Sequence, residues 1–309
     1  MAAASLSSLD QLAAGMRRGV RRVGKRAILP VTHAVGRATR RYYFEDFVRV
    51  YPGGIAYNRL GIRHRARADE LKIFRNHVRV YEFAAQLVAG KRVADVGCGA
   101  GYGCKILHDA GAREVHGCDI SRHALRFARR RFGACAEFTR QTIVDLTDYG
   151  DDSFDIVFSS EVLEHIKEYG LAGAALAELR RIVRPGGLLI VGTPNSELLG
   201  EHGFSFDEIS ALFAGQVHEL LVFENALVPF EAAARDAWRE RAATGRTGVV
   251  VSERVAVEEI PVPPGKVVET KRGEEPGTRT LGGYTFNTGL LHNTHGWIVL
   301  AVEPERGDA

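Results

Sequence analysis

Two carboxylates and an imidazole fall close together in the segment SSEVLEHIKE. Glu161, Glu164 and His165 occupy positions i, i+3 and i+4, which share one face of a helix if the chain turns helically there. Carboxylate and imidazole groups that converge in a cleft can bind a divalent cation. An imidazole can also remove a proton from a hydroxyl group by itself. The residue types therefore leave three roles open: metal binding, general base catalysis by His165, and packing.

Glycines dominate a second segment, RVADVGCGAGYG at residues 92–103. Because glycine has no Cβ, such a loop brings backbone N–H groups close to a ligand. Gly97 and Gly99 have the first spacing of the dinucleotide-binding pattern, but Tyr102 stands where its third glycine belongs. Asp119 follows 22 residues after Gly97, at the tip of the next predicted strand, where a carboxylate can accept both hydroxyls of a ribose. The two features indicate a nucleotide-containing cofactor.

The elements around these residues follow an alternating pattern. Apolar runs predict strands at 92–96, 114–118, 154–158, 187–193, 217–224 and 296–303. Helices are predicted over 66–90, 102–110, 121–132, 171–183 and 205–214. Strands that alternate with helices through short loops indicate right-handed crossovers and a doubly wound, mostly parallel sheet. We therefore expect an α/β fold.

Four segments in order, from Arg92 to Asn195, resemble class I S-adenosylmethionine-dependent methyltransferases. They are DVGCGAGYG, REVHGCDIS, DDSFDIVFSSEVLEHI and RIVRPGGLLIVGTPN. The resemblance implies a Rossmann-like sheet of seven strands and S-adenosyl-L-methionine as the cofactor. The cofactor-binding residues that it implies are Asp95, Gly97, Cys98, Gly99, Gly101, Tyr102, Asp119, Ile120, Thr142, Ile143 and Ser160.

The same resemblance implies individual roles. Asp95 would support the glycine-rich loop, and Asp119 would bind the ribose. Many relatives carry an acid for the adenine amino group where this chain has Thr142, in the segment QTIVDLT. The adenine contact would then be shared between Thr142 and the backbone of Ile143.

The E-x-x-E-H pattern is similar to that of metal-dependent O-methyltransferases of ubiquinone biosynthesis and of small-RNA 3′-terminal 2′-O-methyltransferases. It implies Glu161, Glu164 and His165 as ligands of Mg²⁺, with His202 as a fourth. In relatives without a metal, the histidine acts as a base or shapes the pocket. Glu164 and His165 are accordingly the catalytic candidates.

The expected activity is O-methylation of a hydroxyl on a small-molecule, sugar or lipid-linked acceptor. RNA 2′-O-methylation is the alternative, and a cofactor-binding scaffold without chemistry is a third hypothesis. Residues 1–67 contain 14 Lys and Arg against three acids, a net charge of +11, so this end favours contact with anionic lipid or RNA.

The expected domain organisation has three parts. Residues 1–65 would form a basic N-terminal arm and acceptor cap, and residues 232–280 an insertion or flap before the last strand. Residues 66–231 and 281–305 would form the methyltransferase domain. No run approaches the roughly 20 apolar residues that span a bilayer, and the four cysteines show no C-x-x-C pairing. We therefore expect a cytoplasmic protein that contacts membranes at most peripherally.

Overall fold

The computed structural model describes one part of the chain in detail. The described residues are 49–52, 54–57, 63–66, 68–167, 169–194, 196, 203–213, 220–222, 278–281, 283–287 and 296–304. The chain divides into two compact units, Met1–Phe44 and Glu45–Ala309, and every described residue belongs to the second. Residues 1–48 of the predicted basic arm therefore lie outside the described residues, as does the predicted insertion up to residue 277.

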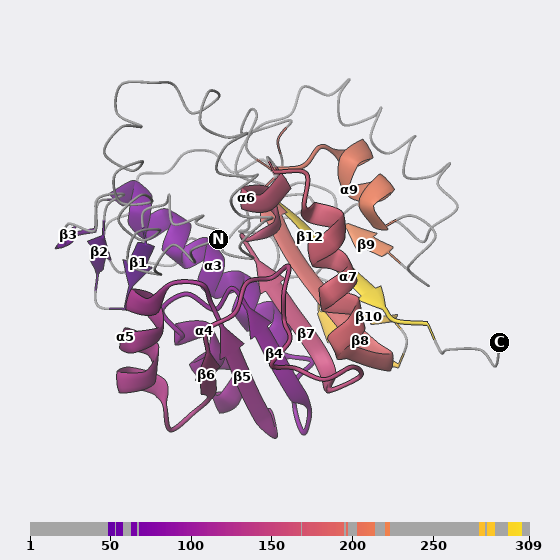
Figure 1. Cartoon of the computed structure of the whole chain (residues 1–309), viewed down its shortest axis with the longest axis horizontal. Coiled ribbons are helices and arrows are strands. Elements are labelled where there is room, and N and C mark those ends of the chain that lie inside the picture. The colour runs from indigo at the N-terminus through magenta and orange to yellow at the C-terminus, as the bar shows by residue number, and fades with distance from the viewer. Residues whose placement is uncertain are drawn as a thin grey trace, which may run out of the picture. The chain divides into compact units, whose positions relative to one another are not determined.

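A seven-stranded sheet forms the centre of the described residues, with strand order β6-β5-β4-β7-β8-β12-β9 (Figure 1). Its strands are β4 (Arg92–Val96), β5 (Glu114–Cys118), β6 (Glu137–Thr139), β7 (Phe154–Ser160), β8 (Val183–Pro194), β9 (Leu220–Val222) and β12 (Gly296–Val302). Neighbours from β6 to β8 are parallel, whereas β12 runs antiparallel to both β8 and β9. The predicted mostly parallel sheet is confirmed.

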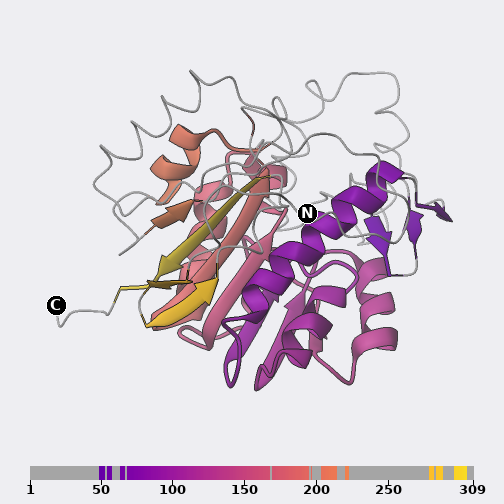
Figure 2. The same ribbon diagram turned by 180° about the vertical axis from the view of Figure 1, so that it is seen from behind.

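Helices cover both faces of this sheet. They are α3 (Ala68–Ala85), α4 (Tyr102–Asp109), α5 (Arg122–Phe132), α6 (Leu163–Lys167), α7 (Ala172–Ile182) and α9 (Phe206–Phe213). Figure 1 shows α7 in front of the sheet, and Figure 2, seen from behind, shows α3 in front of it. The core on the α3 side joins Val80, Leu107 and Leu125 of α3, α4 and α5. The doubly wound architecture is therefore confirmed.

Some helices and strands differ from those predicted. The predicted helix 66–90 ends at Ala85, because the amides of Gln86 and Leu87 bond carbonyls three residues back instead of four. Strand β6 and helix α6, which have only three and five residues, are not predicted by the sequence pattern. Elements that short are too brief to show an apolar period.

Two smaller sheets accompany the main one. Strands β1 (Arg49–Tyr51), β2 (Ile55–Tyr57) and β3 (Arg63–Arg65) form an antiparallel sheet. Strands β10 (Thr278–Leu281) and β11 (Tyr284–Asn287) form a hairpin, so the last predicted insertion residues begin a strand. Phe286 of that hairpin packs edge-on against Phe83 of α3, with ring centroids 5.6 Å apart. Among the described helices, none is long and apolar enough for a bilayer crossing.

Candidate cofactor and catalytic site

The glycine-rich loop joins β4 to α4 and is tied to the end of β5. The amides of Gly97 and Cys98 both donate to the carbonyl of Cys118, at 2.8 and 2.9 Å. Gly97 has φ +87°, and a Cβ there would lie 2.3 Å from Cγ2 of Val162. Gly99 has φ +53°, and a Cβ there would meet nothing within 4 Å. Packing therefore requires glycine at Gly97, whereas Gly99 borders space that a ligand can enter.

Asp119 connects this loop to the start of α5. Its carboxylate accepts hydrogen bonds from the backbone N–H groups of Gly99 at 2.9 Å and Ser121 at 2.8 Å. A carboxylate has about four acceptor positions, so these contacts are compatible with two further hydrogen bonds from a ribose diol. Asp119 is buried, which strengthens such hydrogen bonds relative to those made in water.

Thr142 follows β6 and supplies a buried hydroxyl. Among the described residues, its Oγ1 has no hydrogen-bond partner, and the neighbouring Ile143 is also buried. An unsatisfied buried polar group costs about 1–3 kcal/mol, a penalty that a bound ligand can remove. Gly99, Asp119 and Thr142 follow the carboxyl ends of the neighbouring strands β4, β5 and β6. Together they fit S-adenosyl-L-methionine, with open space at the loop, a ribose acid, and a hydroxyl for the adenine.

Asp95 lies below the loop and makes its contacts with helices. Its carboxylate accepts from the hydroxyl of Tyr81 at 3.1 Å and from the thiol of Cys104 at 3.2 Å. Burial raises the pKa of Asp95 to about 7. In these contacts it supports the loop indirectly, by holding α3 and α4 against β4.

The chain turns sharply between β7 and α6. Helix α6 begins at Leu163, so Glu161 precedes it, and the backbone of Glu161 is left-handed with φ +59°. A non-glycine residue in this conformation is strained by roughly 1–3 kcal/mol, and such strain clusters at functional sites. The single helical face predicted for Glu161, Glu164 and His165 is therefore wrong, because the turn separates Glu161 from the other two.

Each of the three residues has a different neighbour. Oε2 of Glu161 lies 3.9 Å from Nε2 of His77. Glu164 is buried and accepts a hydrogen bond from Oγ1 of Thr193 at 3.1 Å. Its other oxygen, Oε1, lies 3.4 Å from Nε2 of His165, whose side chain is 20% exposed.

Residues 94–191 match the family described as a methyltransferase domain. An S-adenosylmethionine-dependent methyltransferase of Mycolicibacterium smegmatis is 34% identical over 128 residues, 41% of this chain and 48% of the relative. A ubiquinone biosynthesis O-methyltransferase of Mesorhizobium japonicum is 34% identical over 118 residues, 37% of this chain and 45% of the relative. The chain thus spans about half the length of the curated relatives that it matches.

A solved structure of a Haloferax volcanii methyltransferase, in complex with the Trm112 methyltransferase activator, is also similar to the chain. The identity is 19%, over 78% of this chain and 96% of that chain, with a TM-score of 0.48.

The metal site expected in the methyltransferase domain is not assembled by its described residues. Glu161 turns toward His77, while Glu164 is directed into the core toward Thr193. Within the described ranges, no group of three or more His, Cys, Asp or Glu side chains is placed to hold a metal ion. The ligand set Glu161, Glu164 and His165 therefore stays a prediction that the described geometry does not support, and His202 lies outside the described residues.

Burial dominates the electrostatics of the two glutamates. It raises the pKa of Glu161, against the opposing effect of His77. The pKa of Glu164 is raised further, first by burial and then by the charge of Glu161. Both carboxyls therefore keep a proton to higher pH than an exposed glutamate does.

Helix α3 contributes residues that the sequence analysis missed. Nδ1 of His77 lies 3.5 Å from the hydroxyl of Tyr102, so His77 bridges the start of α4 and Glu161. Burial raises the pKa of the Tyr102 hydroxyl. One sequence signal was present: His77 stands four residues before Tyr81, on the same side of an amphipathic helix.

The remaining predicted cofactor residues have their own contacts. A Cβ on Gly101 would lie 2.7 Å from Cβ of Ala128, so this glycine permits α4 to approach α5. The carbonyl of Ile120 accepts a hydrogen bond from Nε of Arg140 at 2.9 Å. The hydroxyl of Ser160 is buried and has no hydrogen-bond partner among the described residues. Ser160 is therefore a second candidate, beside Thr142, for a hydrogen bond to a ligand.

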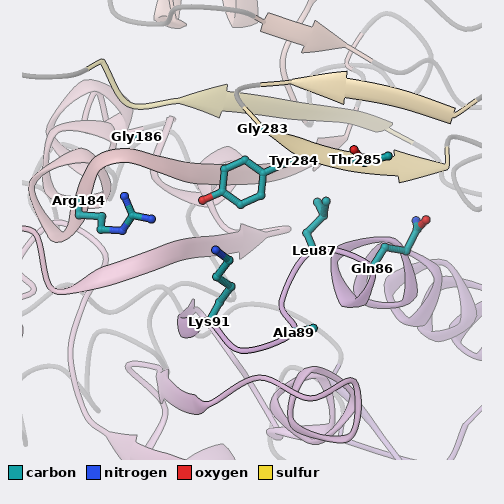
Figure 3. A pocket seen from close by; sticks show the side chains of 9 residues that line it. All are labelled: Gln86, Leu87, Ala89, Lys91, Arg184, Gly186, Gly283, Tyr284 and Thr285. Carbon is teal, nitrogen blue, oxygen red and sulfur yellow. The ribbon is translucent and has the colours of Figure 1, made fainter.

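A separate cavity of about 330 Å³ lies at the amino end of β4, away from the glycine-rich loop at the carboxyl end (Figure 3). It is lined by Gln86, Leu87, Ala89, Lys91, Arg184, Gly186, Gly283, Tyr284 and Thr285. Arg184 pairs with Asp155 at 2.8 Å, which partly neutralises the positive lining. Because the cavity lies at the amino ends of the strands and the glycine-rich loop lies at their carboxyl ends, this cavity is excluded as the cofactor site.

Proposed function

We propose that this chain is an S-adenosylmethionine-dependent O-methyltransferase whose acceptor is a hydroxyl of a small-molecule, sugar or lipid-linked compound. The contact of Val162 with Gly97 carries the proposal, because it brings the segment Glu161–His165 against the cofactor loop. The names of the ubiquinone biosynthesis relatives support an oxygen acceptor.

Methyl transfer to a hydroxyl group has two requirements that the protein must meet. The bound cofactor supplies an electrophilic methyl group on a positively charged sulfur. The chain must hold the acceptor oxygen in line with that methyl group and must receive the proton that the hydroxyl loses. When the C–O bond forms, the C–S bond breaks, and the cofactor leaves as neutral S-adenosylhomocysteine.

His165 is the residue to which we assign the proton. Its imidazole is partly exposed beside the buried carboxyl of Glu164, which in turn is fixed by Thr193. Oε1 of Glu164 lies 3.4 Å from Nε2 of the imidazole, and the ionised carboxylate would stabilise the protonated ring once the pH exceeds the raised pKa of Glu164. Glu164 is thus a positioning residue, and His165 is the general base.

Methyl transfer into an extract of the source cells tests this proposal. The purified chain is incubated with S-adenosylmethionine labelled on the methyl group, and the products are divided into organic, aqueous small-molecule and RNA fractions. We expect label in the organic or small-molecule fraction. His165→Asn should lose at least about 100-fold in rate, a typical contribution of general base catalysis, whereas the exposed control His108→Asn should keep full activity.

Each other outcome has a definite meaning. Label in the RNA fraction would replace the proposed acceptor class with RNA. Cofactor binding without label in any fraction would contradict the proposed activity and favour a cofactor-binding scaffold. Full activity of His165→Asn would remove the general base from this position.

A further inference from the structure

A hollow lined by arginines lies on α5 and just after β6, the edge strand of the main sheet. Figure 1 shows where α5 and β6 lie in the fold. Its volume is about 480 Å³. The lining residues are Arg122, Leu125, Arg126, Arg129, Arg130 and Arg140, and we refer to them as the arginine groove. All five arginines of the groove are exposed.

These arginines differ from Arg180 and Arg181 in how they are paired. No described carboxylate lies within ion-pair distance of them, whereas Arg180 and Arg181 both pair with glutamates. Arg129 donates from Nε and Nη2 to the carbonyl of Phe138, at 3.1 and 2.7 Å. Arg140 donates to a backbone carbonyl as well. Neutral carbonyl acceptors orient a guanidinium group without cancelling its charge.

The arrangement is unfavourable for the isolated helix. Arg122 and Arg126, and then Arg126 and Arg130, are spaced i to i+4, where like charges repel. The first turn of α5 carries no acid to balance the positive end of the helix dipole. An anion bound in the groove would remove both penalties.

We propose that the arginine groove binds a small ligand that carries several phosphate groups. Guanidinium groups match phosphate oxygens with paired, charge-assisted hydrogen bonds, and five arginines line this one hollow. The volume is within the range of small-molecule sites, and a hollow of this kind suits a compact ligand better than a flat membrane surface. The inference is independent of the proposed methyl transfer, because it uses none of the residues assigned to that reaction.

Inorganic tripolyphosphate is the probe for this site. We would titrate it calorimetrically into the full chain, the double variant Arg126→Gln/Arg130→Gln, and the control Arg131→Gln. Arg131 is exposed on the same helix but does not line the groove, so its substitution matches the change in helix type and charge. We expect the double variant to bind at least about tenfold more weakly and the control to stay within about twofold of the wild type.

Equal affinities for tripolyphosphate in all three proteins would overturn the proposal. An equal loss of affinity per charge removed in both variants would overturn it as well. Vesicles of phosphatidylcholine with phosphatidylglycerol, and a single-stranded RNA, serve as further probes. If the binding of vesicles or of RNA depends on Arg126 and Arg130 while the binding of tripolyphosphate does not, the ligand is a membrane or a nucleic acid. The small-ligand proposal then fails. Thermal unfolding and S-adenosylmethionine affinity, both expected to be unchanged, show that the variants fold.

Discussion

At the level of single residues, the two buried acids Asp119 and Asp95 have different structural roles. Asp119 fixes the backbone of the loop through Gly99 and Ser121, while Asp95 holds the side chains of Tyr81 and Cys104. The first acid faces the predicted ligand space and the second faces the core. Their substitution should therefore affect different measurements.

Asp119→Asn should weaken cofactor binding. The asparagine amide keeps the shape of the side chain but removes its charge and one acceptor oxygen. Hydrogen bonds to charged groups contribute about 1.5–3 kcal/mol, so we expect roughly a 10- to 100-fold loss of affinity for S-adenosylmethionine. Titration calorimetry measures it, with the exposed Asp109→Asn as the control. An unchanged affinity would mean that Asp119 only shapes the loop.

Asp95 should make stability depend on pH. Its pKa is raised from 3.8 to about 7 in the native state, whereas the unfolded chain releases this proton near 3.8. Stability from this group is full below pH 3.8 and is lost as the pH rises to about 7, by an amount on the order of 1–4 kcal/mol. Urea unfolding of wild type and Asp95→Asn between about pH 4 and 7 measures it. Parallel pH profiles would contradict the assignment.

At the level of elements, the cofactor loop is shaped by its neighbours on both sides. The end of β5 holds its amides, and the turn after β7 fills the space beside Gly97. The two glycines at the loop's centre are therefore required for different reasons. Gly97 meets Val162, and Gly99 meets open space.

Alanine substitution should separate these constraints. Gly97→Ala places a Cβ 2.3 Å from Val162 and strains a left-handed backbone, so we expect about 2–4 kcal/mol lower stability. Gly99→Ala meets no atom within 4 Å, so we expect roughly 1 kcal/mol lower stability from the backbone alone. Its main effect should be weaker S-adenosylmethionine binding. Urea unfolding and calorimetry measure the two; equal stability losses would contradict the difference in packing.

At the level of the whole molecule, the site joins segments far apart in the chain. His77 of α3 faces Glu161 after β7, and Thr193 at the end of β8 fixes Glu164. The described segments do not bring three metal ligands together. We therefore derive the proton transfer from His165 without assigning a step to a metal ion.

Removal of metal ions tests that assignment in the complete chain. If His165 alone receives the proton, we expect methyl transfer to continue in EDTA, because an imidazole needs no metal ion to act as a general base. The measurement is the rate of label transfer before and after chelation, with added Mg²⁺ as the control. Loss in EDTA and recovery with Mg²⁺ would show that His202 or another residue outside the described ranges completes a metal site.

The sequence determined the architecture and the positions at which a cofactor is expected. The predicted strands 92–96 and 114–118 coincide with β4 and β5, and the glycine-rich loop begins directly after β4. The position of Asp119 followed from a predicted strand end, whereas Thr142 was implied only by the family resemblance, because β6 before it was not predicted. The local sequence pattern is sufficient to place a functional residue when that residue directly follows a predicted strand.

Only the tertiary structure decided how the E-x-x-E-H segment is used. The spacing of Glu161, Glu164 and His165 predicted one helical face, but the left-handed turn at Glu161 separates it from the other two residues. The participation of His77 was equally hidden, because its contact with Glu161 spans 84 positions of sequence. Periodicity describes one element at a time, whereas a turn's conformation and a contact between distant elements are set by the packing of the whole core.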